Sequence, residues 1–112
     1  APTRSATLAP ASGARIVLVT APHAAAPKIA EDLVRRGIAA CVNVLPGVRS
    51  VYRWKGRVEK ARESLLLVKT TVGRGSALAA RLAATHPYEV PEYLAIGPSE
   101  GLSSYLAWLR GS

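Results

Sequence analysis

The chain has 112 residues, of which 49% are hydrophobic and 20% charged, so global disorder is excluded and one compact domain is expected. Fifteen Lys and Arg against seven Asp and Glu give a net charge of +8. This excess fits either a nucleic-acid or acidic-membrane partner or a solvated basic surface. The single cysteine, Cys41, excludes an intrachain disulfide and favours a reducing, cytoplasmic location. No apolar stretch reaches the ~18 residues needed to span a bilayer, so no membrane partner is expected.

The first elements are predicted from apolar runs and from the proline and glycine residues beside them. Residues 1–14 are small and polar, which predicts a flexible N-terminal tail and leaves 15–112 as the folded domain. The continuous apolar run Ile16–Thr20 predicts a strand that is buried on both faces and central in its sheet. A helix is expected next, with Pro27 in its first turn and Gly37 at its C-terminal cap.

Two long strands are expected in the middle of the chain. The first runs from Ile38 to Trp54 with a break at Pro46-Gly47, and the second covers Arg57–Thr71. A tight turn at Lys55-Gly56 would join them and place Trp54 opposite Arg57. Counting back from that pair puts Cys41 opposite Thr70, although the break at Pro46-Gly47 leaves this register open. The polar first half of the second long strand is expected to project beyond the sheet or to meet another subunit.

The remaining elements complete a familiar order. A helix from Ser76 should stop near His86, because Pro87 disfavours helical geometry at the residue before it. A short strand over Glu92–Ile96 and a final amphipathic helix over Leu102–Leu109 follow. The order strand, helix, strand, strand, helix, strand predicts an α+β domain with an antiparallel sheet, the ferredoxin-like split βαβ plan, plus a C-terminal helix.

Three blocks of sequence then point to a known family. They are Ala-Ala-Cys-Val-Asn at Ala39–Asn43, Tyr-Arg-Trp at Tyr52–Trp54, and His-Pro-Tyr-Glu-Val-Pro-Glu at His86–Glu92. With these blocks in this order, the chain from about Arg15 to Arg110 resembles the CutA divalent-cation tolerance proteins. The resemblance implies a ferredoxin-like fold and a tight homotrimer in which the two long strands pair across subunits. It also implies a non-enzymatic role in binding and tolerating divalent metals, including copper.

Cys41, His86 and Glu89 are the candidate metal ligands. Thiolate and imidazole suit copper(II) or another divalent cation, with carboxylate as a supplement. No Cys-x-x-Cys or His-x-x-x-His spacing is present, so the metal prediction depends mainly on the resemblance. Cys41 could equally be a small buried strand residue, and His86 a helix-end residue bonded to the backbone. The sequence leaves open whether the ligands come from one subunit or two.

A cleft between the second strand and the His86–Glu92 segment is the expected place for this site. The residues expected to line or support it are Tyr52, Trp54, Lys69, Tyr88 and Glu92. A reactive Cys41–His86 pair is disfavoured, because an apolar strand does not lower a thiol pKa, and no enzyme activity is therefore expected.

The segment Arg49–Arg62 carries six basic residues, one acid (Glu59) and two aromatic rings. Such a segment can hold single-stranded nucleic acid. Because no known nucleic-acid motif accompanies it, a protruding hairpin that packs on a neighbouring subunit is favoured, and nucleic acid is not expected as a partner. The alternative function is a PII-like trimeric signalling module that binds a nucleotide or small anion between subunits through Lys69 and the basic hairpin. That alternative is an analogy from the fold alone.

Overall fold

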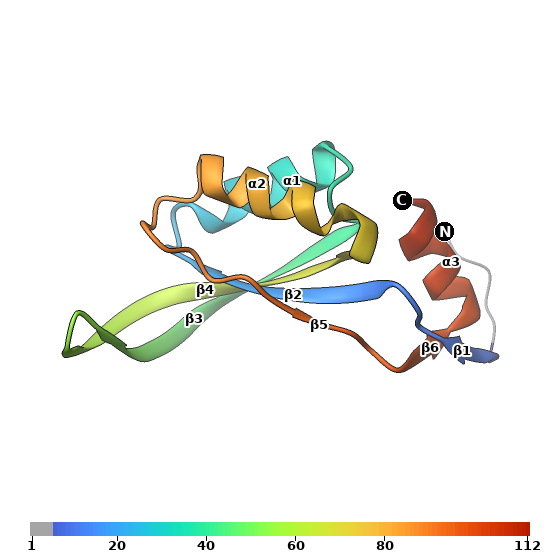
Figure 1. Ribbon diagram of the computed structural model, residues 1–112, viewed down its shortest axis with the longest axis horizontal. Helices are drawn as coiled ribbons and strands as arrows, with labels where there is room; N and C mark the ends of the chain where they lie inside the picture. The colour runs from blue at the N-terminus through green and yellow to red at the C-terminus, as the bar shows by residue number, and fades with distance from the viewer. Residues whose placement is uncertain (1–5) are drawn as a thin grey trace.

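The protein is described by a computed structural model over residues 6–112. Its main sheet is antiparallel, in the order β3-β4-β2-β5, which is the ferredoxin-like arrangement predicted from the sequence. The elements that build this unit are β2 (Ala14–Ala21), α1 (Ala26–Arg35), β3 (Cys41–Trp54), β4 (Arg57–Thr71), α2 (Gly75–Thr85) and β5 (Leu94–Ile96). The two strands with continuous apolar runs, β2 and β4, are the central pair, as predicted. Helices α1 and α2 lie side by side over one face of the sheet (Figure 1).

The core lies between that face and the helices. Alternate residues of the central strands point toward the helices, and Val17, Val19, Leu66 and Val68 are completely buried there. They meet apolar side chains of α1 and α2, such as Leu33. Each such side chain stabilises the fold by about 1.5–3 kcal/mol relative to exposure.

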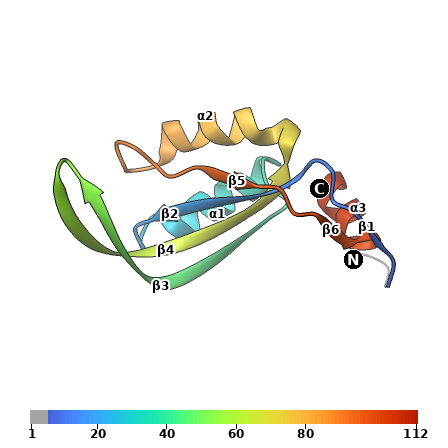
Figure 2. The same cartoon turned by 60° about the horizontal axis from the view of Figure 1, so that its bottom comes forward.

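The opposite face of the sheet differs from the prediction. The continuous apolar runs predicted burial on both faces, but Ile16 and Leu18 of β2 and Leu65 and Leu67 of β4 are only half-buried. No helix covers this face in Figure 1 or Figure 2, which shows the same chain turned by 60°. Within a single chain the prediction was therefore wrong for this face, because no second layer packs on it.

Strands β3 and β4 continue beyond β2 as a two-stranded extension, residues 48–63, which we call the arm. Pairing of β2 with β4 ends at Ala21 and Ser64, so no third strand of the described residues pairs with the arm. It curves away from the body of the molecule (Figures 1 and 2). Its turn has positive φ at Lys55 (50°) and Gly56 (77°), the backbone that a two-residue hairpin of matching twist requires.

The register of the arm was predicted correctly at its tip but not at its base. Trp54 pairs with Arg57 as expected. A β-bulge between Leu45 and Val48 then shifts the register by one residue, so that Cys41 lies opposite Lys69 and not opposite Thr70. The cause is the extra residue that the bulge inserts into one strand at Pro46-Gly47, where Gly47 has φ of +77°.

A second, two-stranded sheet was not predicted. It joins β1 (Leu8–Pro10) to β6 (Glu100–Leu102), and α3 (Ser103–Gly111) packs beside it, while the short 3₁₀ turn η1 (Val72–Arg74) precedes α2. Ala11 and Ala14 are buried with Leu106 and Leu109 of α3 in a small separate core.

The predicted flexible tail, residues 1–14, was therefore wrong over residues 8–14, and residues 1–5 lie outside the described part of the chain. Small side chains predicted no burial, but alanines can fill the narrow space against α3. The pairing partner is also some ninety residues away, so local composition gives no sign of it. In the described chain, no helix is long and apolar enough to cross a membrane.

Candidate functional site

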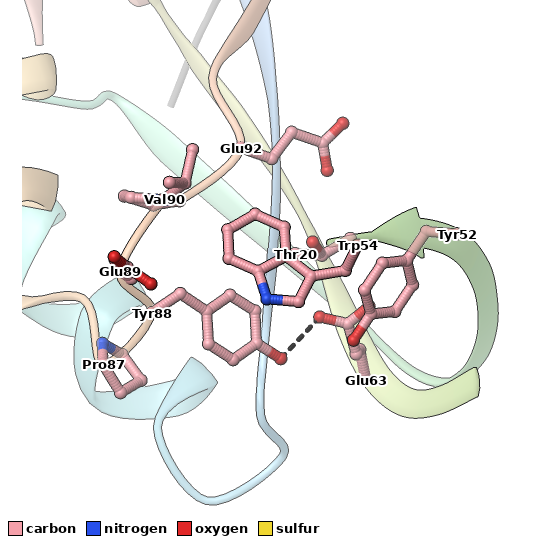
Figure 3. A pocket seen from close by; sticks show the side chains of 10 residues that line it. Thr20, Tyr52, Trp54, Glu63, Pro87, Tyr88, Glu89, Val90 and Glu92 are labelled. Carbon is pink, nitrogen blue, oxygen red and sulfur yellow. Dashed lines mark hydrogen bonds between the residues drawn. The ribbon is translucent and has the colours of Figure 1, made fainter. Parts of the chain in front are cut away.

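A pocket of about 490 Å³ lies between the arm and the segment that follows α2. Volumes of this size are typical of small-ligand sites. Figure 3 shows the pocket from close by. Its lining residues are Thr20, Tyr52, Trp54, Glu63, Pro87, Tyr88, Glu89, Val90, Pro91 and Glu92.

The pleat of the arm explains why three of these side chains meet. Residues two apart on a strand point to the same face, and directly opposed partners share that face. Tyr52 and Trp54 therefore lie on the same face of β3, and the pairing of Val48 with Glu63 places Glu63 on it too. The other wall comes from 87–92, where Pro87 and Pro91 prevent continuation of α2.

Glu63 is the buried acid of this pocket, with only 5% of its surface exposed. The Tyr88 hydroxyl donates a hydrogen bond to Glu63 Oε2 at 2.6 Å, across the space between the segment and β4 (Figure 3). Burial, followed by this hydrogen bond, raises the pKa of Tyr88 well above its ordinary value. Tyr88 therefore keeps its proton at neutral pH and acts as the donor to the carboxylate.

Glu63 was missed by the sequence reasoning, although a signal for it existed. Once Trp54 is placed opposite Arg57, counting along the pleat puts every second residue of β4 on the face of the aromatic rings, and Glu63 is one of them. The poorly alternating composition of the arm hid this, since its other face also carries charged residues.

His86 is held by the backbone and does not line the pocket. It is 8% exposed, and its Nε2 lies 2.8 Å from the carbonyl oxygen of Thr20. The backbone N–H of Tyr88 donates to His86 Nδ1 at 3.1 Å. A carbonyl only accepts and an N–H only donates, so these partners assign the proton to Nε2. Both ring nitrogens are therefore engaged, which matches the helix-end alternative that the sequence left open.

The other seven predicted site residues divide into two groups. Five of them line the pocket together: Tyr52, Trp54, Tyr88, Glu89 and Glu92. Cys41 and Lys69 instead face each other across β3 and β4 in another part of the sheet. The Cys41 thiol is partly exposed, and its Sγ lies 4.0 Å from Asn43 Oδ1.

The predicted metal ligands do not converge within one chain. Cys41 pairs through Lys69 with Ile16 of β2, whereas His86 contacts Thr20 of the same strand. These two points are four residues apart, a distance of about 13 Å along β2 alone. Among residues 6–112, no group of three or more His, Cys, Asp or Glu side chains could hold one metal ion. The donor set of a single chain therefore does not fit copper.

Charge is distributed unevenly at this site. Glu63, Glu89 and Glu92, three of the seven acidic residues of the chain, line the pocket, and no Lys or Arg side chain among residues 6–112 does. Lys55 lies over the Trp54 ring, with Nζ 5.7 Å from the ring centroid, but it is not a lining residue. The pocket is thus an acidic and aromatic region of a strongly basic protein.

Strand order, helix placement and the long paired strands define a small α+β protein of the ferredoxin-like class. A model of the family described as CutA1 divalent ion tolerance protein matches residues 15–112. The chain belongs to this family, as the resemblance in its sequence indicated.

Individual relatives agree with this assignment. The divalent-cation tolerance protein CutA of Thermus thermophilus is 49% identical over 96 residues, covering 85% of this chain and 93% of the relative. A solved structure of the Thermus thermophilus protein matches with a TM-score of 0.85 and 47% identity, covering 88% of this chain and 96% of that one. CutA from Synechococcus elongatus gives a TM-score of 0.89 at 34% identity, with 95% of each chain covered. A structure described as a PII-like protein CutA from Nostoc matches with a TM-score of 0.81 at 35% identity, covering 87% and 94%.

Proposed function

We propose that this protein is a non-enzymatic homotrimer that binds copper(II) or another divalent cation and supports tolerance to it, in the cytoplasm. Membership of a divalent ion tolerance family carries the cation part of this proposal. The partly exposed thiol of Cys41, which forms no disulfide, fits the reducing location.

The trimer is supported by apolar surface that one chain leaves uncovered. The face of the main sheet opposite the helices is only half-buried, and β5 exposes Leu94 (59%) and Ile96 (49%). The arm exposes Val51 (66%) and Val58 (67%). Exposed apolar surface of this kind is typical of subunit contacts, and a cyclic assembly would cover the strand edges of every copy equally.

Copper ligands would then have to come from more than one subunit. Cys41 is the available soft donor, Glu89 is exposed at the pocket, and His86 would have to release one of its two hydrogen bonds to bind a metal. We therefore place Cys41 of one subunit and Glu89 or His86 of another in the proposed site.

Calorimetric titration with Cu(II) tests this assignment. The wild type should bind saturably, and Cys41→Ser and His86→Ala should each bind at least tenfold more weakly, the loss of one metal donor. Cys41→Ala, measured beside Cys41→Ser, distinguishes the loss of the sulfur donor from the loss of a polar side chain at this position. Unchanged affinity in the Cys41 and His86 variants would remove both residues from the site.

The alternative is a PII-like signalling module that binds a nucleotide or small anion. A relative described as PII-like supports it at the level of the fold. The charge of the pocket opposes it, because three carboxylates repel an anion and Lys69 lies elsewhere. Thermal-shift measurements with Cu(II) and with ATP discriminate between the two, and stabilisation by ATP alone would reverse the ranking.

A further inference from the structure

The pocket between the arm and residues 87–92 holds carboxylates that form no ion pair with residues 6–112. Among the described residues the ion pairs involve only Glu31 and Asp32, both on α1. Within the described part of the chain, Glu63, Glu89 and Glu92 therefore have no Lys or Arg partner within 4 Å. These carboxylates would attract a cation that is not part of the chain.

Glu63 is the carboxylate for which a cationic partner would matter most. It is 95% buried, and the Tyr88 hydroxyl donates the one hydrogen bond that the described residues give to it, at Oε2. Its second oxygen accepts no hydrogen bond from the described residues and is not fully buried, and Glu63 lines the pocket. A buried carboxylate is costly unless it is paired and hydrogen-bonded, and a cation that donates to this oxygen would remove that cost.

The walls of the pocket select the kind of cation. The rings of Tyr52, Trp54 and Tyr88 surround Glu63 (Figure 3), and indole and phenol rings attract organic cations through their π faces. A bare metal ion needs several donors at about 2 Å, and the described residues contain no such cluster. A cation with an apolar body of several atoms can pack this body on the rings and place its charged groups on the carboxylates.

We propose that this pocket binds a small organic ammonium ion, such as an alkyl diamine, whose N–H groups donate to Glu63 and Glu92 while its carbon chain packs on Trp54 and Tyr52. This binding goes beyond the proposed metal function and does not depend on it. A net charge of +8 repels cations at long range. The affinity must therefore come from these local contacts.

Three compounds of equal length and different charge test the proposal: 1,4-diaminobutane, 4-amino-1-butanol and 1,4-butanediol. Calorimetric titrations in buffer with chelator exclude metal effects. Affinity should rise with charge along the series, roughly tenfold for each ammonium group that gains a charge-assisted hydrogen bond. A Trp108→Phe background leaves Trp54 as the one tryptophan, and its fluorescence should change over the same concentration range as the heat.

Matched variants locate the site. Glu63→Gln and Glu92→Gln should each weaken 1,4-diaminobutane binding by roughly tenfold. Glu100→Gln on β6 makes the same change in net charge outside the pocket and should bind like the wild type. Because Glu63→Gln alters a buried group, Glu92→Gln at the partly exposed rim keeps the test valid if the first variant misfolds.

Several results would overturn the proposal. They are no saturable binding up to roughly 20 mM, equal affinity for the diamine and the diol, or unchanged affinity in every foldable pocket variant. If the wild type binds no amine and the pocket variants lose subunit assembly, the basic arm of a second copy fills the pocket instead, and the proposal is again overturned. If amine binding is not observed, Cu(II) binding is still tested separately by the Cu(II) titration.

Discussion

Asp32 joins the two helices that cover the sheet. Its Oδ2 accepts from Arg81 Nε at 2.7 Å, and its Oδ1 accepts from Arg36 Nε at 2.8 Å. These hydrogen bonds, led by that of Arg81, hold the pKa of the Asp32 carboxyl well below its ordinary value. Because the pKa is lowered in the folded state, the stabilisation is complete above the unfolded-state value near ~3.9 and is lost as the pH falls further.

We expect Asp32→Asn to lower the free energy of unfolding by about 1–2 kcal/mol at neutral pH. The gap between wild type and variant should shrink as the pH falls below about 4. Urea unfolding across this pH range measures it. Glu31→Gln, which breaks an exposed pair with Arg35, is the control and should change little. A gap that stays constant with pH would contradict the assigned role of Asp32.

His86 closes an open strand edge. Strand β5 pairs with β2 only from Ile16 to Leu18, so the carbonyl oxygen of Thr20 lies beyond its end and accepts from His86 Nε2. We expect His86→Ala to destabilise the fold by about 1–3 kcal/mol in the presence of chelator, because a buried acceptor loses its partner. Nitrogen NMR should show the proton on Nε2, and a proton on Nδ1 would contradict this hydrogen-bond assignment.

At the scale of elements, local signals predicted most of the fold. Apolar runs located β2 and β4, Gly37 and Pro87 marked helix ends, and the Lys55-Gly56 turn gave the register at the arm tip. The bulge at Pro46-Gly47 and the pairing of β1 with β6 were not predictable in this way. Both depend on which residues meet across the sheets, and a bulge or a pairing of distant segments leaves little trace in local composition.

The candidate site was predictable to a similar extent. Pattern and resemblance together found five pocket residues, including Tyr88 and Glu92, but placed Cys41 and His86 in a common cleft. Their separation follows from the strand positions they occupy, near Ile16 and at Thr20 of β2. Glu63 can be assigned to the pocket face only by counting alternate residues along β4 from the Trp54–Arg57 pair, a step that the sequence reasoning did not take.

Strand β1 provides a test at the same scale. Removing residues 1–10 takes away the partner of β6 and one carbonyl that accepts from Arg110, and uncovers Ala11. We expect the thermal midpoint to fall by about 5 °C or more, the shift that roughly 1 kcal/mol produces in a domain of this size. Leu8→Ala, which leaves the backbone pairing in place, should have a smaller effect because Leu8 is 60% exposed. An unchanged midpoint would mean that β1 adds nothing to the fold.

At the scale of the whole molecule, the net charge of +8 includes two local concentrations of opposite sign. Six basic residues lie on the arm, and three acids lie in the pocket beside its base. The long-range field repels cations while the pocket attracts them locally. Any cation bound here is therefore selected by contact geometry, and its affinity should depend on the pocket carboxylates more than on ionic strength.

The arm also has a second face, and substitutions on this face are the best test of assembly. Tyr52 and Trp54 point to the pocket, so alternation places Val51 on the opposite face, and Val58 lies there too because it pairs with Arg53. We expect wild type to be trimeric by light scattering at micromolar concentration, and Val51→Asp combined with Val58→Asp to shift it to monomer, because two buried unpaired charges oppose the contact.

Val34→Asp combined with Val72→Asp introduces the same charges at two other exposed valines, 44% and 59% exposed, on α1 and η1. This control should remain trimeric and should melt at the wild-type temperature. Dissociation by both double variants would indicate a general charge effect, and a monomeric wild type would exclude the trimer outright. Loss of assembly by the arm variant alone would establish that the face of the arm turned away from the pocket holds the subunits together.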